Sequence, residues 1–116
     1  MITPSNSYKV YVAVQPVDFR KGMDGLAAII QNEFKLDPFC GTIFVFRAKR
    51  ADRLKLVIWD GTGLVLVNKH IESGKFAWPS ISDGLIKLSR SQFEALFEGI
   101  EWRNISHRRI RAPARV

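Results

Sequence analysis

Residues 53–71 read RLKLVIWDGTGLVLVNKHI, two strand-like runs joined by a glycine-rich turn. The turn Asp60-Gly61-Thr62-Gly63 is a strong hairpin signal, and either a two- or a four-residue loop pairs Trp59 with Leu64. Carried along the ladder, this register pairs Val57 with Leu66, Lys55 with Asn68 and Arg53 with His70. Because side chains alternate along a strand, all of these residues share one face of the predicted hairpin.

The two faces of this hairpin differ in polarity. One face, predicted to be the core face, has Lys69 as its polar exception and otherwise carries Leu54, Leu56, Ile58, Val65, Val67 and Ile71. The other face is apolar near the turn and polar at the far end of the hairpin. That end lies beside the connector that precedes the hairpin and carries Arg47, Lys49 and Arg50. The register therefore predicts a patch of Arg47, Lys49, Arg50, Arg53 and Lys55. Arg and Lys held on a rigid sheet can bind phosphates, although an ordinary solvated hairpin loop is the alternative interpretation.

The flanking sequence predicts further strands and two helices. A β-branched and aromatic run at 8–14 and the segments 42–47 and 85–88 are typical of strands. Apolar residues at helical spacing predict a helix over 23–34, and Ser89 with Gln92 forms a capping-box pattern before a helix that Gly99 ends. These elements predict one compact α+β domain, with a mostly antiparallel sheet of about five strands and both helices packed on one face.

Charge is distributed unevenly along the 116 residues, whose formal net charge is +7. Residues 1–102 hold 13 Lys and Arg against 11 Asp and Glu, whereas residues 103–116 hold five arginines and no acid. We therefore expect a single domain over 1–102 and a basic, flexible tail over 103–116. Such a tail either binds nucleic acid or only solvates the chain. Its arginines are Arg103, Arg108, Arg109, Arg111 and Arg115.

Several classes of protein are excluded by composition. The apolar runs are far shorter than the roughly 20 residues that a membrane span requires, so no membrane is expected as a partner. The first residues lack the basic and apolar regions of a secretory signal. Cys40 is the single cysteine and has no disulfide partner in the chain. These features predict a cytoplasmic location.

Catalytic chemistry is not favoured by the motifs. Asp18, Asp24, Asp52 and Asp60 could hold a divalent metal, but each has a simpler role in a turn, at a helix start or beside an arginine. His70 and His107 lack zinc-site spacing, and the glycines do not compose a phosphate-binding loop. We therefore expect no enzyme activity, no metal and no cofactor. Trp59 either stacks on a base or belongs to a minor core, whereas Trp78 and Trp102 are expected to be buried.

Several phrases resemble one known family. They occur in the family's order and spacing, and are Val17–Leu26, Phe44–Arg47, Asp52–Lys55, Trp59–Leu64, Lys75–Pro79 and Glu98–Trp102. Over Val10–Trp102 the chain is similar to the TnpB-type accessory proteins of the IS sixty-six insertion-sequence family, the products of its second open reading frame. The resemblance implies a role in DNA transposition and recombination beside a separate, larger transposase, and it brings no known active site. The tail matches no family pattern, and His70 stands where relatives often carry arginine.

The sequence thus predicts a noncatalytic accessory protein of a mobile element that binds DNA through a basic loop. The predicted contacts on the folded body are Arg20, Lys21, Arg47, Lys49, Arg50, Arg53, Lys55, Trp59 and His70. In the tail they are Arg108, Arg109 and Arg111. The first alternative is a protein-interaction module that docks on the element-encoded transposase, and the second is a metal-dependent nuclease.

Overall fold

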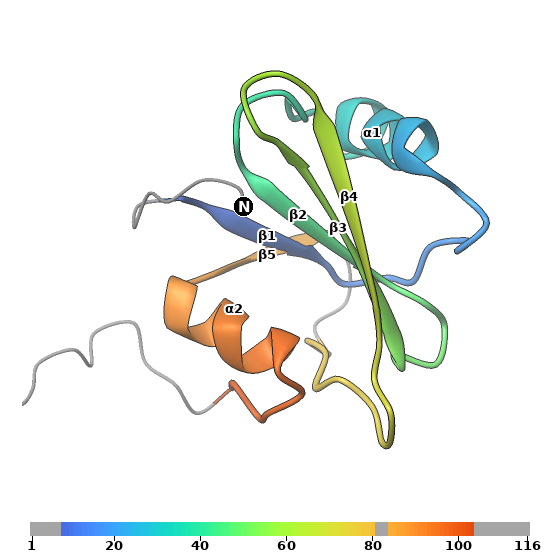
Figure 1. Cartoon of the computed structure of the whole chain (residues 1–116), viewed down its shortest axis with the longest axis vertical. Helices are drawn as coiled ribbons and strands as arrows, with labels where there is room; N and C mark the ends of the chain where they lie inside the picture. The colour runs from blue at the N-terminus through green and yellow to red at the C-terminus, as the bar shows by residue number, and fades with distance from the viewer. Residues whose placement is uncertain (1–7, 81–83, 104–116) are drawn as a thin grey trace, which may run out of the picture.

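The computed structural model describes residues 8–80 and 84–103, which form one mixed sheet and two helices (Figure 1). The helices are α1 (Met23–Asn32) and α2 (Arg90–Phe97). The strands are β1 (Val10–Ala13), β2 (Ile43–Arg47), β3 (Arg53–Trp59), β4 (Leu64–His70) and β5 (Leu85–Leu88). Their order in the sheet is β4-β3-β2-β1-β5; β1 and β2 run parallel, and the other neighbours are antiparallel. The predicted mostly antiparallel α+β domain is confirmed.

The β3–β4 hairpin has the register that its turn predicts. Arg53 pairs with His70, Lys55 with Asn68, Val57 with Leu66 and Trp59 with Leu64. The Asp60 N–H donates to the Gly63 carbonyl at 3.0 Å, and Asp60 Oδ1 accepts the N–H groups of Thr62 and Gly63, each at 3.0 Å. These bonds to the ionised carboxylate hold the pKa of Asp60 below its usual value. A local turn thereby determines the whole ladder.

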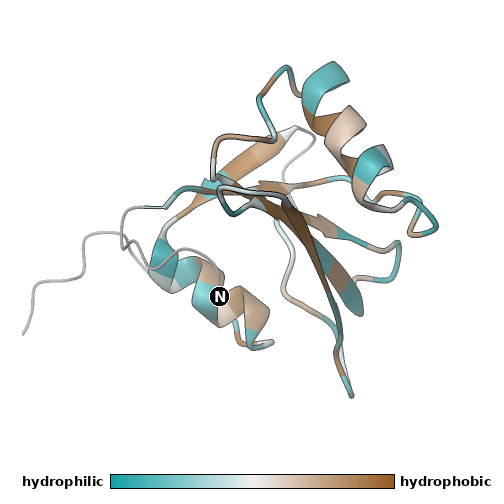
Figure 2. Cartoon of the chain, turned by 45° about the horizontal axis from the view of Figure 1, so that its top comes forward, coloured by the Kyte–Doolittle hydropathy of each residue, from teal (hydrophilic) through white to brown (hydrophobic). Residues whose placement is uncertain are grey.

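The two helices lie on opposite faces of the sheet, as Figure 2 shows. Leu26, Ile29 and Ile30 of α1 pack with Phe44, Phe46 and Val57, while Phe93 and Leu96 of α2 pack with Val45, Leu54 and Leu56. The prediction that both helices share one face is therefore wrong.

The connection between β1 and β2 explains this arrangement. Parallel neighbours need a crossover, and α1 is the crossover helix, so it covers the face that carries Phe44 and Phe46. Val57, predicted to face away from the main core, is fully buried beneath α1. Strand β2 is apolar on both faces, which is the sequence signal for cover on each side.

Trp78 and Trp102 anchor the segments that follow β4 and α2 in the core. Trp78 and Trp102 are 8% and 6% exposed, which confirms their predicted burial. The Trp78 indole donates to the Ala13 carbonyl at 2.8 Å, and the Trp102 indole donates to the carbonyl of Ala77. Each indole N–H thus has the acceptor that a buried tryptophan needs.

Helix α2 begins and ends as its sequence predicts. Ser89 is the N-cap, and its side chain accepts the Gln92 N–H while Gln92 accepts the Ser89 N–H. Gly99, just beyond the helix, has φ +82°, the left-handed conformation that favours glycine. No helix among residues 8–80 and 84–103 is long and apolar enough to cross a membrane.

Candidate nucleic-acid interface

One end of the β3–β4 hairpin forms a depression of about 240 Å³. It is assembled from three segments: the start of β3, the end of β4 and the loop between β1 and α1. Its lining residues are Phe19, Arg53, Leu54, Lys55, Asn68, Lys69 and His70. The register thus brings together Arg53, Lys55, Asn68 and His70 as the sequence predicts.

The connector between β2 and β3 is a tight turn that exposes Lys49 and Arg50. The Ala51 N–H donates to the Ala48 carbonyl at 3.0 Å, and Ala51 has φ +60°, which is uncommon for a residue with a side chain. The Phe76 N–H donates to the Ala51 carbonyl at 2.8 Å and supports the turn from outside the hairpin. The two cations therefore project from a backbone that is hydrogen-bonded at both ends.

Three cations here are unpaired within the described ranges. Across the part of the chain that the structure describes, the side chains of Lys49, Arg50 and Arg53 make no hydrogen bond or ion pair. All three residues are exposed. We call Lys49, Arg50 and Arg53 the basic rim.

Arg47 is placed differently from the basic rim. It lies opposite Leu54 in the β2–β3 ladder, so by alternation it belongs to the side of the sheet that α2 covers. Its Nε donates to the Val14 carbonyl at 3.0 Å, and its Nη1 donates to the Lys49 carbonyl at 3.2 Å. Burial lowers the pKa of this guanidinium. Arg47 thus fastens the connector to the end of β1.

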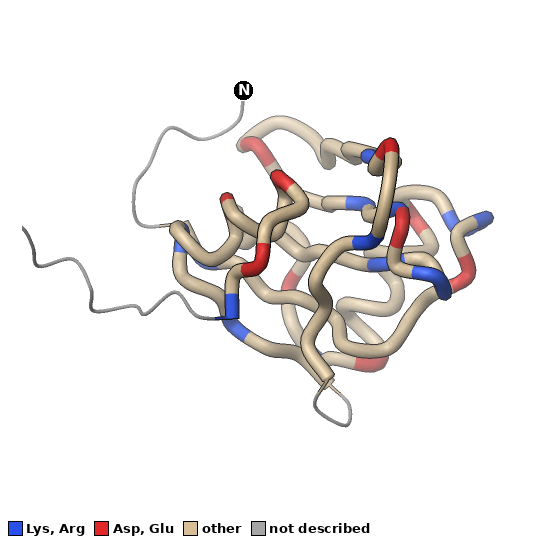
Figure 3. The backbone as a smooth tube through the Cα atoms, turned by 90° about the horizontal axis from the view of Figure 1, so that it is seen from below, with Lys and Arg blue, Asp and Glu red and all other residues tan. Residues whose placement is uncertain are grey.

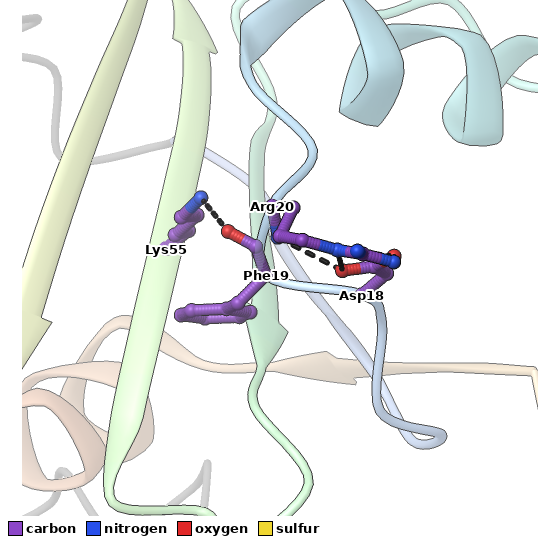
Figure 4. A network of polar contacts seen from close by, with 4 residues as sticks. All are labelled: Asp18, Phe19, Arg20 and Lys55. Carbon is purple, nitrogen blue, oxygen red and sulfur yellow. Dashed lines mark hydrogen bonds and ion pairs between the residues drawn. The ribbon is translucent and has the colours of Figure 1, made fainter.

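Lys55 lies in the depression but is only 9% exposed. Its Nζ donates to the Phe19 carbonyl at 2.9 Å and lies 4.7 Å from the centre of the Phe19 ring (Figure 4). It also donates to the Lys21 carbonyl at 2.9 Å. The ammonium group therefore ties the loop before α1 to the sheet. Strand alternation correctly predicts which face of the hairpin carries Lys55. It does not predict that the loop before α1 covers this residue.

Arg20 and Lys21 belong to that loop. Arg20 grips Asp18 with Nε at 3.1 Å from Oδ1 and Nη2 at 2.8 Å from Oδ2, although its side chain is 91% exposed (Figure 4). The guanidinium holds the pKa of the Asp18 carboxyl well below its usual value. Lys21 is exposed and makes no side-chain hydrogen bond or ion pair among the described residues, although its charge also helps to lower the pKa of Asp18. Lys21 therefore presents a net charge, whereas Asp18 balances Arg20.

His70 and Asp52 form a second local pair. His70 Nε2 lies 3.7 Å from Asp52 Oδ2, and the imidazole side chain is 63% exposed. The sequence suggested that Asp52 pairs with a neighbouring arginine; its carboxylate instead faces His70 across the hairpin. As a result, Arg50 and Arg53 have no acidic partner in residues 8–80 and 84–103.

Trp59 lies at the opposite end of β3 from Arg53, about 20 Å away at the rise of an extended strand. Its ring meets Phe39 edge-on, with centroids 5.6 Å apart at 87°. Its cross-strand partner Leu64 packs in the α1-side cluster. These contacts favour the minor-core interpretation, and they separate Trp59 from the depression.

The remaining predicted contacts do not contribute to this geometry. Arg108, Arg109 and Arg111 lie outside the described residues. Arg103, which opens the predicted tail, donates to Glu101 from Nε at 2.7 Å and lowers the pKa of that carboxyl to about 2. Figure 3 shows that basic and acidic positions are both scattered along the described backbone.

Two residues that line the depression were not among the contacts predicted from the sequence. Phe19 walls the depression, and Asn68 supplies an exposed amide to it. The register already placed Asn68 opposite Lys55, whereas Phe19 is 36 residues from its lysine partner. No group of three or more His, Cys, Asp or Glu that could hold a metal ion occurs in residues 8–80 and 84–103.

Comparison with known proteins gives the family. The model of the family described as IS66 Orf2 like protein matches residues 8–107. Two uncharacterized proteins of Sinorhizobium fredii are similar: y4jC is 46% identical over all of this chain and 99% of its own length, and y4hO is 36% identical over 90% of each chain. No solved structure matches. The family match spans the hairpin, the connector and the loop that build the depression, and the chain belongs to the IS66 Orf2-like family, which supports an accessory role in transposition.

Proposed function

We propose that this protein is a noncatalytic accessory protein of insertion-sequence transposition that binds the DNA backbone through its basic rim. The observation that carries the proposal is the state of Lys49, Arg50 and Arg53, which are exposed and unpaired among the described residues, on a hydrogen-bonded turn. Arg and Lys neutralise phosphates and release counterions, and a rigid support sets their spacing. The family supplies the setting of transposition.

The other predicted cations have different parts in this proposal. Arg47 and Lys55 position the connector and the loop, because Arg47 Nε and Nη1 and two of the three Lys55 N–H groups donate to carbonyl groups. Lys21 adds a contact from the loop, and Arg20 does so only where a phosphate displaces Asp18. Arg108, Arg109 and Arg111 add attraction that is independent of DNA sequence.

Duplex binding across a salt series tests the basic rim. The full-length triple variant Lys49→Ala/Arg50→Ala/Arg53→Ala should bind more weakly, and the slope of log affinity against log salt should fall by about 0.9 for each phosphate that the variant no longer neutralises. The matched control is Lys9→Ala/Lys35→Ala/Lys87→Ala, which removes the same charge from other exposed positions. Equal reductions in affinity for both variants would show that net charge alone attracts DNA.

The tail is tested separately in the full-length protein. Arg108→Ala/Arg109→Ala/Arg111→Ala should lower affinity for element-end and scrambled duplexes alike and leave the contribution of the basic rim in place. If this variant loses all binding while the rim variant keeps it, the interface lies in the tail and not on the folded body.

One observation favours a second function, docking on the element-encoded transposase. Strand β4 is an edge strand, and its apolar residues Leu64, Val65, Leu66 and Val67 are half-buried rather than covered. Such an edge can accept a strand from a partner. Recovery of the transposase by the rim variant, with DNA affinity unchanged by the rim substitutions, would favour this function over DNA binding.

A further inference from the structure

We propose that the depression beside the basic rim is a site for a single phosphate group of the DNA backbone. This inference rests on the proposed function and deepens it, because it separates one specific phosphate contact from the general attraction of the rim. The site consists of Lys55, Asn68, His70 and Arg53, the residue of the basic rim that also lines the depression.

The first argument is a buried positive charge without a counter-ion among the described residues. Lys55 is 9% exposed, and its ammonium donates to two neutral carbonyls. Lys55 takes part in no ion pair within residues 8–80 and 84–103. Buried charges are usually paired, because an unpaired charge away from water is costly. An anion that entered the depression would supply the missing negative charge.

The second argument is the convergence of donors on one spot. Arg53 lies opposite His70 and Lys55 opposite Asn68, with all four side chains on one face of the hairpin. Directly opposed side chains begin about 5 Å apart and diagonal neighbours about 7–8 Å apart, a span that long side chains such as Arg53 and Lys55 can bridge to share one tetrahedral anion. The Arg53 guanidinium and the Asn68 amide have no partner within the described chain. A guanidinium can bind two phosphate oxygens at once.

The third argument is the distribution of nearby acids. Asp52 lies beside His70 at 3.7 Å, and Asp18 is gripped by Arg20. Neither acid forms an ion pair with Arg53 or Lys55 within the described ranges. The two cations outnumber Asp52, so the depression keeps a net positive charge even when His70 is neutral.

The size of the depression selects a phosphate group over a flipped nucleotide. Its volume of about 240 Å³ lies below the roughly 300–1,000 Å³ of pockets that enclose larger small-molecule ligands. The Phe19 ring provides an apolar wall, against which the sugar next to a bound phosphate can pack. We therefore assign the floor of the site to phosphate oxygens and its edge to the deoxyribose.

The test uses inorganic phosphate as the probe and amide NMR of the full-length protein as the readout. Wild-type protein should show saturable shifts at Phe19, Arg53, Asn68 and His70, which chloride at equal ionic strength does not reproduce. Two variants keep the net charge: Asn68→Ala removes a neutral donor, and Arg53→Lys removes the guanidinium fork. Each should weaken phosphate binding about tenfold, since a hydrogen bond to a charged group contributes on this scale. Gln31→Ala, exposed on α1, is the matched control and should change nothing.

The outcomes separate this inference from the proposed function. The variant Lys49→Ala/Arg50→Ala should lose duplex affinity and keep the phosphate shifts. Absence of saturable shifts, with duplex binding still dependent on the rim, overturns the phosphate site alone. Absence of both phosphate and duplex binding overturns both. Duplex DNA should displace bound phosphate from the wild type; duplex binding without displacement would assign the site to a free phosphate compound and overturn its link to the DNA backbone.

Discussion

At the scale of single residues, the hydrogen-bond partners of a cation separate roles that its charge does not. Arg20 is almost fully exposed, yet Asp18 holds its guanidinium through two close contacts. Lys55 is nearly covered, yet it lies in the depression and donates to neutral acceptors. Judged by exposure alone, Arg20 would be taken for the cation with an uncompensated charge. Its charge is balanced by Asp18, whereas that of Lys55 meets neutral carbonyls.

The Asp18–Arg20 pair gives a prediction about pH. Since Arg20 lowers the pKa of Asp18 below its ordinary 3.8, the pair should contribute stability above about pH 3.8. That contribution should disappear as pH falls through the lower, folded-state pKa. Arg20→Ala should move the carboxyl titration midpoint of Asp18 up toward 3.8, as followed by NMR. Lys35→Ala is the control and should leave the midpoint unchanged; an unshifted midpoint in Arg20→Ala would contradict the pairing.

At the scale of elements, α2 is held at both ends by specific polar groups. The capping box satisfies backbone N–H groups at its start, and Lys69 Nζ donates to the Phe97 carbonyl at 2.6 Å at its end. The Lys69 ammonium also lies 4.2 Å from the centre of the Phe97 ring. The polar exception on the predicted core face thus satisfies a terminal carbonyl that the helix itself leaves free.

Gly99 provides a test of how α2 ends. Its φ is +82°, and a Cβ there would lie 2.7 Å from Ile71 Cδ1. Gly99→Ala should therefore lower the free energy of unfolding by about 1–2 kcal/mol, the cost of the left-handed conformation for a residue with a side chain. Urea denaturation measures this change. Gly63→Ala, where a Cβ has open space, is the matched control; equal effects of the two substitutions would contradict the proposed cause.

At the scale of the whole molecule, the sheet separates two hydrophobic cores, and different elements cover each of them. The α1-side core is closed by the crossover helix, and the loop before this helix is tied down by Lys55. The α2-side core is closed by α2 and by the segments that carry Trp78 and Trp102. The depression lies where the loop, β3 and β4 meet, so its geometry depends on elements that are distant in sequence.

The position of Trp102 in the α2-side core predicts where the folded domain ends. Trp102 is buried in the α2-side core and is the last residue along the chain in either described core. A chain that stops after Arg103 should therefore keep the unfolding midpoint of the full-length protein, as measured by thermal or urea denaturation. Trp102→Ala should lower the free energy of unfolding by about 3–5 kcal/mol, the usual cost of emptying a buried aromatic site. A large loss of stability on removal of residues 104–116 would move the boundary into the tail.

The sequence alone determined those features that depend on neighbouring residues. The Asp60–Gly63 turn determined the β3–β4 register. This register places Arg53, Lys55, Asn68 and His70 on one face of the hairpin. Ser89 and Gln92 determined the start of α2, because a capping box is complete within one helical turn.

Only the tertiary structure decided which face each helix covers and which of the described cations remain unpaired. Lys55 meets carbonyls 34 and 36 residues away, and Arg47 meets one 33 residues away. Asp52 could have paired with either neighbouring arginine by sequence, and the hairpin instead turned it toward His70. A pattern of residues specifies periodicity and turns through local contacts, whereas burial and pairing follow from where distant segments of the chain pack.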